Sequence, residues 1–174
     1  MSINIRKIGI TDLDVDCIVN AANSSLLKGG GVCGAIFREA GAWNMQRACD
    51  KYGYCPTGSA VITPGFKLRA KFVIHAVGPI WRGGSNGEEK QLHDCYQASM
   101  KLAEENGCRS IAFPVISSGI YGYPKEEAWK VALKSVSKYL RAHPDYDLEV
   151  TFAVLDDRMY DMGTKILDSL TKLN

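Results

Sequence analysis

The chain lacks several features that would assign it to a specialised class of protein. No apolar run approaches the roughly 18 residues that a membrane-spanning helix requires. The net charge is only +2 and no basic run is present, so the sequence does not indicate tight electrostatic binding to nucleic acid. No internal repeat, low-complexity stretch or linker interrupts the 174 residues. The length therefore fits a single domain, residues 1–174, with a core of ordinary size.

The cysteines form no C-x-x-C pair and have no spacing typical of metal ligands. They are Cys17, Cys33, Cys49, Cys55, Cys95 and Cys108. Their even number is compatible with disulfides, but the N-terminal residues Met-Ser-Ile-Asn-Ile-Arg do not resemble a signal peptide. We therefore expect reduced thiols, a cytoplasmic protein and no metal site.

Strand-like and helix-like segments alternate along the chain. The expected strands cover residues 3–10, 16–21, 59–63, 72–77, 111–116 and 148–155. The expected helices cover residues 35–52, with a break near Gly41, and then 87–107, 125–142 and 160–173. Strands that alternate with long helices predict an α/β fold, a three-layer α/β/α sandwich around a mixed, largely parallel central sheet.

The most informative stretch is residues 20–34, where two asparagines and three consecutive glycines follow a short apolar run. The glycines, residues 29–31, stand at the mouth of an expected helix. There, backbone N–H groups can approach an anion closely, and the helix dipole adds about half a positive charge. The stretch therefore predicts a ligand that carries phosphate. Asn20 and Asn23 suggest a sugar or another polar group beside that phosphate.

The spacing Gly29-x-Gly31-x-x-Gly34 also matches the dinucleotide-binding pattern, but the surrounding sequence opposes that interpretation. In the dinucleotide fold the first glycine directly follows its strand, whereas Asn-Ser-Ser-Leu-Leu-Lys intervenes here. The acidic residue about 20 positions on, Asp50, lies in a helical segment. No Gly-Lys-Ser/Thr follows, which opposes a P-loop. A simple tight turn would explain the glycines but not the asparagines.

A second loop, residues 114–124, also lies between an expected strand and an expected helix. Its small residues, from Ser117 to Gly119, can direct N–H groups at an anion, and Tyr121 could cover a ligand. In parallel α/β sheets, ligands bind outside the carboxyl ends of the strands. Two such loops therefore predict a diphosphate held between them.

With both loops in place, the chain resembles the macrodomain family, in particular the ADP-ribosyl hydrolases and O-acetyl-ADP-ribose deacetylases. Four motifs in the same order carry the resemblance, which covers nearly the whole chain. They are Ile18-Val-Asn-Ala-Ala-Asn-Ser-Ser-Leu, Gly29-Gly-Gly-Val-x-Gly-Ala-Ile, Val73-Ile-His-Ala-Val-Gly-Pro and Phe113-Pro-x-Ile-Ser-x-Gly-x-Tyr-Gly-Tyr-Pro. The resemblance implies an α/β/α sandwich with an ADP-ribose cleft and no required cofactor. The implied partner is ADP-ribose or an ADP-ribosylated protein, without a membrane, and the protein is expected to be a monomer.

The resemblance also implies roles for individual residues. Asn23 would meet the distal ribose and orient the water or the substrate, and Cys33 occupies the second catalytic position. One phosphate would lie on the glycine loop and the other on the second loop, while the adenine end would lie near Ile10 and Leu155. The complete implied binding set is Gly9, Ile10, Asn23, Gly30, Gly31, Val32, Cys33, Gly34, Ser117, Ser118, Gly119, Ile120, Tyr121, Leu155 and Asp156.

Three residues depart from the hydrolase pattern. The hydrolases usually have Asp where Cys33 stands, His where Phe37 stands, and an adenine-binding Asp where Gly9 stands. Asp12 is expected to point elsewhere, given a strand that runs to Ile10. Losing one hydrogen bond to the base would cost about 1 kcal/mol, which weakens binding without abolishing it.

The departures leave two functions open. An enzyme would hydrolyse the ester of mono-ADP-ribosylated acidic side chains or of O-acetyl-ADP-ribose. A binding module would read ADP-ribose without cleaving it, as Cys33 and Phe37 suggest. A thiol is a poor substitute for a carboxylate that polarises water. A nucleophilic Cys33 is disfavoured because no activating His is near it in sequence, and His75 is expected to be a core residue. We favour the enzyme, because substrate phosphate and a water held by Asn23 could share the work. Binding of a nucleotide polymer is disfavoured by the absence of interleaved arginine and aromatic residues.

Overall fold

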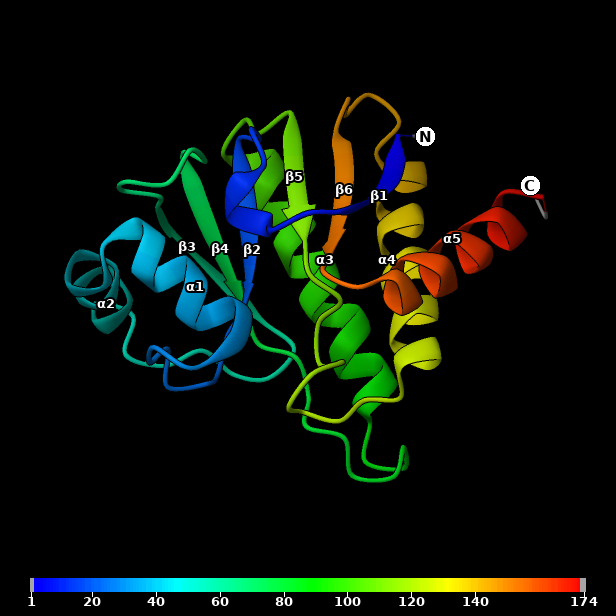
Figure 1. The fold of residues 1–174 in the computed structure, drawn as a ribbon, viewed down its shortest axis with the longest axis horizontal. Coiled ribbons are helices and arrows are strands. Elements are labelled where there is room, and N and C mark those ends of the chain that lie inside the picture. The colour runs from blue at the N-terminus through cyan, green and yellow to red at the C-terminus, as the bar shows by residue number, and fades with distance from the viewer. Residues whose placement is uncertain (1, 173–174) are drawn as a thin grey trace.

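The computed structural model describes residues 2–172 and contains one six-stranded sheet with helices on both faces (Figure 1). The strands are β1 (Ile3–Lys7), β2 (Cys17–Ala21), β3 (Ala60–Pro64), β4 (Phe72–Ala76), β5 (Ser110–Phe113) and β6 (Glu149–Val154). The helices are the short 3-10 helix η1 (Ile10–Asp12), α1 (Gly31–Ala40), α2 (Ala42–Asp50), α3 (Glu88–Glu105), α4 (Lys125–Ala142) and α5 (Asp157–Lys172). The expected alternation of strands and helices is confirmed.

The strands lie in the order β1-β6-β5-β2-β4-β3. All neighbouring pairs are parallel except β3 and β4, which are antiparallel. The prediction of a mixed, largely parallel sheet is therefore confirmed. Because β2, β5 and β6 run in the same direction, the loops that follow them emerge at one edge of the sheet, where α/β proteins bind ligands.

Alternate residues of each strand face opposite layers, so the sheet separates two cores. Cys17 and Val19 of β2 belong to the core beneath α3 and α4, whereas Ile18 belongs to the core beneath α1 and α2. Trp129 is buried in the first core and Phe37 in the second. The three-layer α/β/α sandwich is thus confirmed (Figure 1).

Two expected strands end three residues before the sequence pattern indicates. The strand expected over residues 3–10 is wrong in its second half, because β1 ends at Lys7 and Ile10 begins η1. The strand expected over residues 111–116 ends at Phe113, because Pro114 has no N–H group with which to continue the ladder.

The expected helix ends also shift. The break near Gly41 is confirmed, and this residue has a φ of 99° that favours glycine. However, α1 begins at Gly31 instead of residue 35. Similarly, α5 begins at Asp157, since the carboxylate of Asp156 accepts the Met159 N–H at 2.8 Å and caps the helix. Its expected continuation to residue 173 lies outside the described residues. Among residues 2–172, no helix is long and apolar enough to cross a membrane.

Candidate ligand-binding cleft

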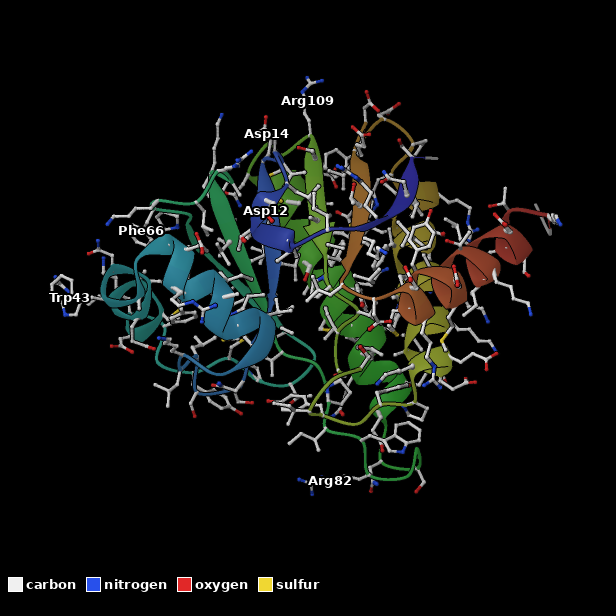
Figure 2. The ribbon with its side chains drawn as sticks, viewed as in Figure 1. Asp12, Asp14, Trp43, Phe66, Arg82 and Arg109 are labelled. Atoms are coloured by element: carbon white, nitrogen blue, oxygen red, sulfur yellow. The ribbon has the colours of Figure 1, made fainter. Side chains whose placement is uncertain are left out.

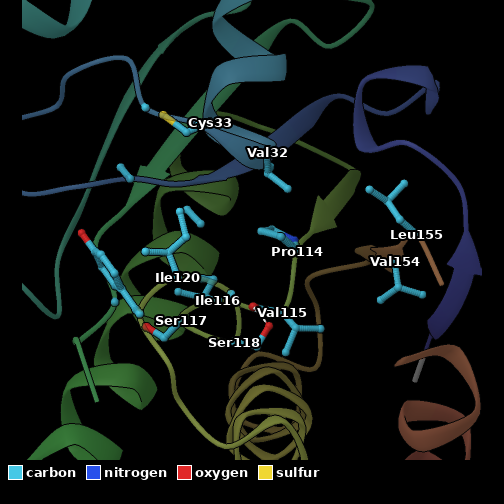
Figure 3. A pocket seen from close by; sticks show the side chains of 18 of the residues that line it. Val32, Cys33, Pro114, Val115, Ile116, Ser117, Ser118, Ile120, Val154 and Leu155 are labelled. Atoms are coloured by element: carbon cyan, nitrogen blue, oxygen red, sulfur yellow. Dashed lines mark hydrogen bonds between the residues drawn. The ribbon is translucent and has the colours of Figure 1, made fainter. Parts of the chain in front are cut away.

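A cleft of about 440 Å³ lies at the carboxyl ends of β2, β5 and β6 (Figure 3). Its volume is typical of a small-molecule site. Most of the predicted binding residues line it: Asn23, Gly30, Gly31, Val32, Cys33, Ser117, Ser118, Gly119, Ile120, Tyr121 and Leu155. The cleft therefore brings the glycine loop, the second loop and the end of β6 together.

The glycine loop places free backbone donors at one wall of the cleft. In the described part of the chain, the N–H groups of Gly31, Val32 and Cys33 have no acceptor, as expected for the first turn of a helix. Gly29 passes so close to this turn that a Cβ on Gly34 would lie 2.6 Å from the Gly29 carbonyl oxygen. The first turn of α1 can therefore hold an anion with backbone groups and the helix dipole.

The second loop supplies donors from another wall. The N–H groups of Gly119, Ile120 and Tyr121 have no acceptor within the described residues. Ser117 has a φ of 68°, rare for a residue with a side chain, and its hydroxyl donates to the Pro79 carbonyl at 2.7 Å. This bond anchors the base of the loop and leaves its donors free.

A neighbouring loop supports the second loop from outside the cleft. The Trp81 N–H donates to the Tyr121 carbonyl at 2.8 Å. Beyond Trp81, the buried carboxylate of Glu88 accepts the N–H groups of Arg82, Gly84 and Asn86 at 2.9, 2.9 and 2.6 Å, while Arg82 itself projects into solvent (Figure 2). Burial acts to raise the pKa of Glu88, but the backbone donors outweigh it and lower the pKa to about 2.

The cleft is uncharged. None of the residues that line it in the described chain carries an ionisable acidic or basic side chain of Asp, Glu, Lys, Arg or His. Nor do residues 2–172 contain a cluster of three or more His, Cys, Asp or Glu side chains placed to hold a metal ion. An anion in this cleft would therefore be held by backbone N–H groups.

Asn23 lies in the cleft lining and also closes its own loop. Its Oδ1 accepts the Leu27 N–H at 3.0 Å, and its Nδ2 donates to the Leu27 carbonyl at 2.9 Å. Each of these side-chain atoms has one remaining hydrogen-bonding position. The amide is thus fixed in orientation while still able to bind a ligand.

Asn20 does not line the cleft, so the expectation that it stands beside the ligand is wrong. It is buried in the core, with its Nδ2 3.1 Å from His75 Nδ1 and 3.5 Å from Cys33 Sγ. His75 is also buried, and its Nε2 lies 3.0 Å from Thr63 Oγ1, so the expectation of a satisfied core histidine is confirmed. Burial lowers the pKa of His75 to about 4.

Cys33 and Phe37 are both buried, although Cys33 is among the residues that line the cleft. Cys33 is 7% exposed, and its thiol donates towards the Leu27 carbonyl at 3.8 Å. Phe37 is 1% exposed and meets the His75 ring edge-on, with 6.2 Å between the ring centroids. Phe37 therefore fills the core and is not available to a ligand.

Four predicted residues are not among those that line the cleft: Gly9, Ile10, Gly34 and Asp156. The expectation that Asp12 points away from Gly9 is wrong. Because the chain leaves β1 at Lys7 and turns into η1 at Ile10, Asp12 Oδ2 lies 3.0 Å from the point where a Cβ on Gly9 would stand, and Figure 2 shows Asp12 on this turn.

Sequence reasoning missed several small and apolar lining residues. They are Ala21, Ala22, Gly29, Gly78, Pro114, Val115, Ile116, Ala153, Val154 and Met159. Most of them stand at or directly after the end of a parallel strand, which is the pattern that could have identified them.

The fold and the cleft define a macrodomain, and comparison with known proteins agrees. The Macro domain family matches residues 19–132, and this chain belongs to that family. The O-acetyl-ADP-ribose deacetylase of Salmonella gallinarum is 54% identical over 162 residues, which cover 91% of this chain and 89% of the relative. The macro domain-containing protein CT2219 of Chlorobaculum tepidum is 51% identical over 165 residues, 95% of each chain.

Solved structures give the same assignment. The Oceanobacillus iheyensis macrodomain with ADP has a TM-score of 0.90 at 37% identity and covers 98% of this chain and 92% of that one. The Trypanosoma brucei macrodomain in complex with ADP-ribose has a TM-score of 0.85 at 39% identity, covering 94% of this chain and 68% of that one.

Proposed function

We propose that this chain binds ADP-ribose in the cleft and hydrolyses the ester of O-acetyl-ADP-ribose to ADP-ribose and acetate. The observation that carries the proposal is the pair of loops that direct free N–H groups into one uncharged cleft. A diphosphate is the ligand that two adjacent groups of backbone donors suit best. Relatives named O-acetyl-ADP-ribose deacetylase at 48% and 54% identity support the choice of substrate.

The two loops divide the ligand between them. The first turn of α1 holds one phosphate and the backbone of residues 117–121 holds the other. The adenine end lies towards Leu155, and the distal ribose lies towards Asn23, at opposite ends of the lining. Ile120 and Leu155 are 92% and 75% exposed, and a bound ligand would cover part of both side chains.

Hydrolysis begins when a water oxygen attacks the carbonyl carbon of the acetyl ester. The bond between the acetyl carbonyl carbon and the ribose oxygen then breaks, that oxygen takes up a proton to become the ribose hydroxyl, and acetate leaves. Asn23 orients the water or the ester through its remaining hydrogen-bonding positions. Because the described lining holds no carboxylate or imidazole, the substrate phosphate accepts the proton of the attacking water.

The same bond chemistry occurs where ADP-ribose is esterified to an aspartate or glutamate side chain of a protein. We include such mono-ADP-ribosylated proteins as a second substrate of the cleft. We further propose that the protein acts as a monomer in the cytoplasm. Its six cysteines are free and buried, which suits a reducing compartment.

The alternative is a module that binds ADP-ribose without cleaving it. Two observations favour it: the described lining holds no side-chain base, and the Cys33 thiol is hydrogen-bonded to the protein. Both features are compatible with a protein that binds ADP-ribose tightly and does not hydrolyse its esters.

The test is a time course of ADP-ribose release from O-acetyl-ADP-ribose and from a glutamate-linked mono-ADP-ribosylated protein. Binding of ADP-ribose is measured on the same sample. Release that is lost in Asn23→Ala supports the hydrolase. Asn106→Ala, which alters an exposed asparagine remote from the cleft lining, is the matched control and should release at the wild-type rate. Binding without release assigns the alternative function, and absence of binding refutes both.

A further inference from the structure

A buried group of polar side chains lies directly behind the glycine loop. Asn20 of β2 and His75 of β4 are register partners in adjacent strands. The Nδ2 of Asn20 has two hydrogens, and two acceptors are close to it: His75 Nδ1 at 3.1 Å and Cys33 Sγ at 3.5 Å. Since His75 Nδ1 accepts from Asn20, the proton of its neutral ring is on Nε2, which faces Thr63 Oγ1.

The orientation of the Asn20 amide follows from this arrangement. Its Oδ1 is buried and has no partner among residues 2–172. Nδ2 is the only atom of this amide that can donate, and it faces the two acceptors His75 Nδ1 and Cys33 Sγ. The buried amide thus donates to His75 on the neighbouring strand and to Cys33 on α1, while its carbonyl oxygen has no partner within the described residues.

The hydrogen bonds continue from Cys33 to the loop. With its sulfur accepting from Asn20, the thiol donates towards the Leu27 carbonyl at 3.8 Å. Asn23 Nδ2 donates to that same carbonyl at 2.9 Å. The Leu27 carbonyl is therefore the point where the rigid sheet, through Asn20 and Cys33, meets the side chain of Asn23.

We propose that Cys33 is a positioning residue whose thiol, held by Asn20, fixes the turn that presents Asn23 to the distal ribose. The inference rests on the proposed binding of ADP-ribose. It assigns the sulfur a role within the protein: Cys33 is only 7% exposed, and a Cβ on Gly29 would lie 3.8 Å from its Sγ, so the loop packs over it.

The test compares two ligands of the Cys33→Ala variant. ADP lacks the distal ribose, so it engages the phosphate loops but not Asn23. We expect Cys33→Ala to weaken ADP-ribose binding about three- to tenfold, as for the loss of one hydrogen bond, while ADP binding stays within about twofold. An equal loss for both ligands, or no loss for either, would overturn the inference. Cys95→Ala removes another buried thiol, in the other core, and should leave both affinities unchanged.

A double-mutant cycle then tests whether Cys33 acts through Asn23. In the Asn23→Ala background, Cys33→Ala should change ADP-ribose affinity less than about twofold, because the side chain that it positions is gone. Full additivity would contradict the inference. Failure of the unmodified protein to bind ADP-ribose would instead refute the proposed function, so the two failures are distinguishable.

Discussion

Gly34→Ala tests the close packing of the glycine loop on α1. A Cβ at this position would stand 2.6 Å from the Gly29 carbonyl oxygen, a backbone atom that can move only if the whole loop shifts. Overpacking of this kind costs about 1–3 kcal/mol. Alanine inside a helix recovers about 1 kcal/mol relative to glycine. The net loss is therefore about 1 kcal/mol, and the Tm should fall by about 2–4 °C.

The matched variant is Gly30→Ala, where a Cβ would meet no atom within 4 Å and the backbone is extended, with a φ of −92°. We expect its unfolding free energy to stay within about 0.5 kcal/mol of the wild type. Thermal and urea unfolding followed by circular dichroism measure both variants. Gly34→Ala should also weaken ADP-ribose binding, since the loop moves. A Gly34→Ala protein at least as stable as the wild type would refute the packing argument.

Three further predictions concern pH and salt. The pKa of Glu88 in the folded state, about 2, is below its ordinary value of 4.5, so its contribution to stability is complete above pH 4.5 and is lost as the pH falls towards 2. Urea unfolding of Glu88→Gln should therefore show a weaker dependence on pH in that window, and an unchanged dependence would count against the role of the three N–H donors. The pKa of His75 in the folded state is about 4, below its ordinary value of 6.5, so between these pH values the unfolded chain binds a proton that the folded chain does not. The free energy of unfolding should therefore fall by about 3 kcal/mol as the pH drops from 6.5 to 4. Urea unfolding of His75→Leu should lack this pH dependence, whatever the stability of the variant. Because no charged side chain lines the cleft in the described chain, the Kd for ADP-ribose by calorimetry should change less than about threefold between 50 and 500 mM NaCl, and a steep loss of affinity would reveal an ion pair.

Much of the fold could be predicted because a helix or strand with one face in the core and the other in solvent has a clear periodic pattern of apolar residues. The helix over residues 125–142 is confirmed with the same bounds, since its apolar residues repeat at helical spacing and Pro124 marks its start. The pattern failed at Ile10, where alternation continues past the point at which the chain leaves the sheet. The resulting turn brings Asp12 back to Gly9, which no periodicity reveals.

The sequence predicts the two loops that form the cleft, but not where the helix α1 begins. Because glycine has poor helix propensity, the sequence predicts a helix only from residue 35, whereas residues 31–34 form the first turn of α1. This glycine-rich first turn is also the anion site, because its free backbone N–H groups are the donors that would bind a phosphate. Asn20 and Asn23 look equivalent in sequence. Only the pairing of Asn20 with His75 in the sheet shows that one asparagine faces the core and the other the cleft.

Binding of ADP-ribose in the cleft is tested by titrating the purified protein with ADP-ribose and by solving a crystal structure of the complex. We expect one bound ligand per chain, with its diphosphate on the N–H groups of residues 31–33 and 119–121 and its distal ribose at Asn23. A diphosphate bound elsewhere, or no measurable binding at millimolar ADP-ribose, would contradict this expectation.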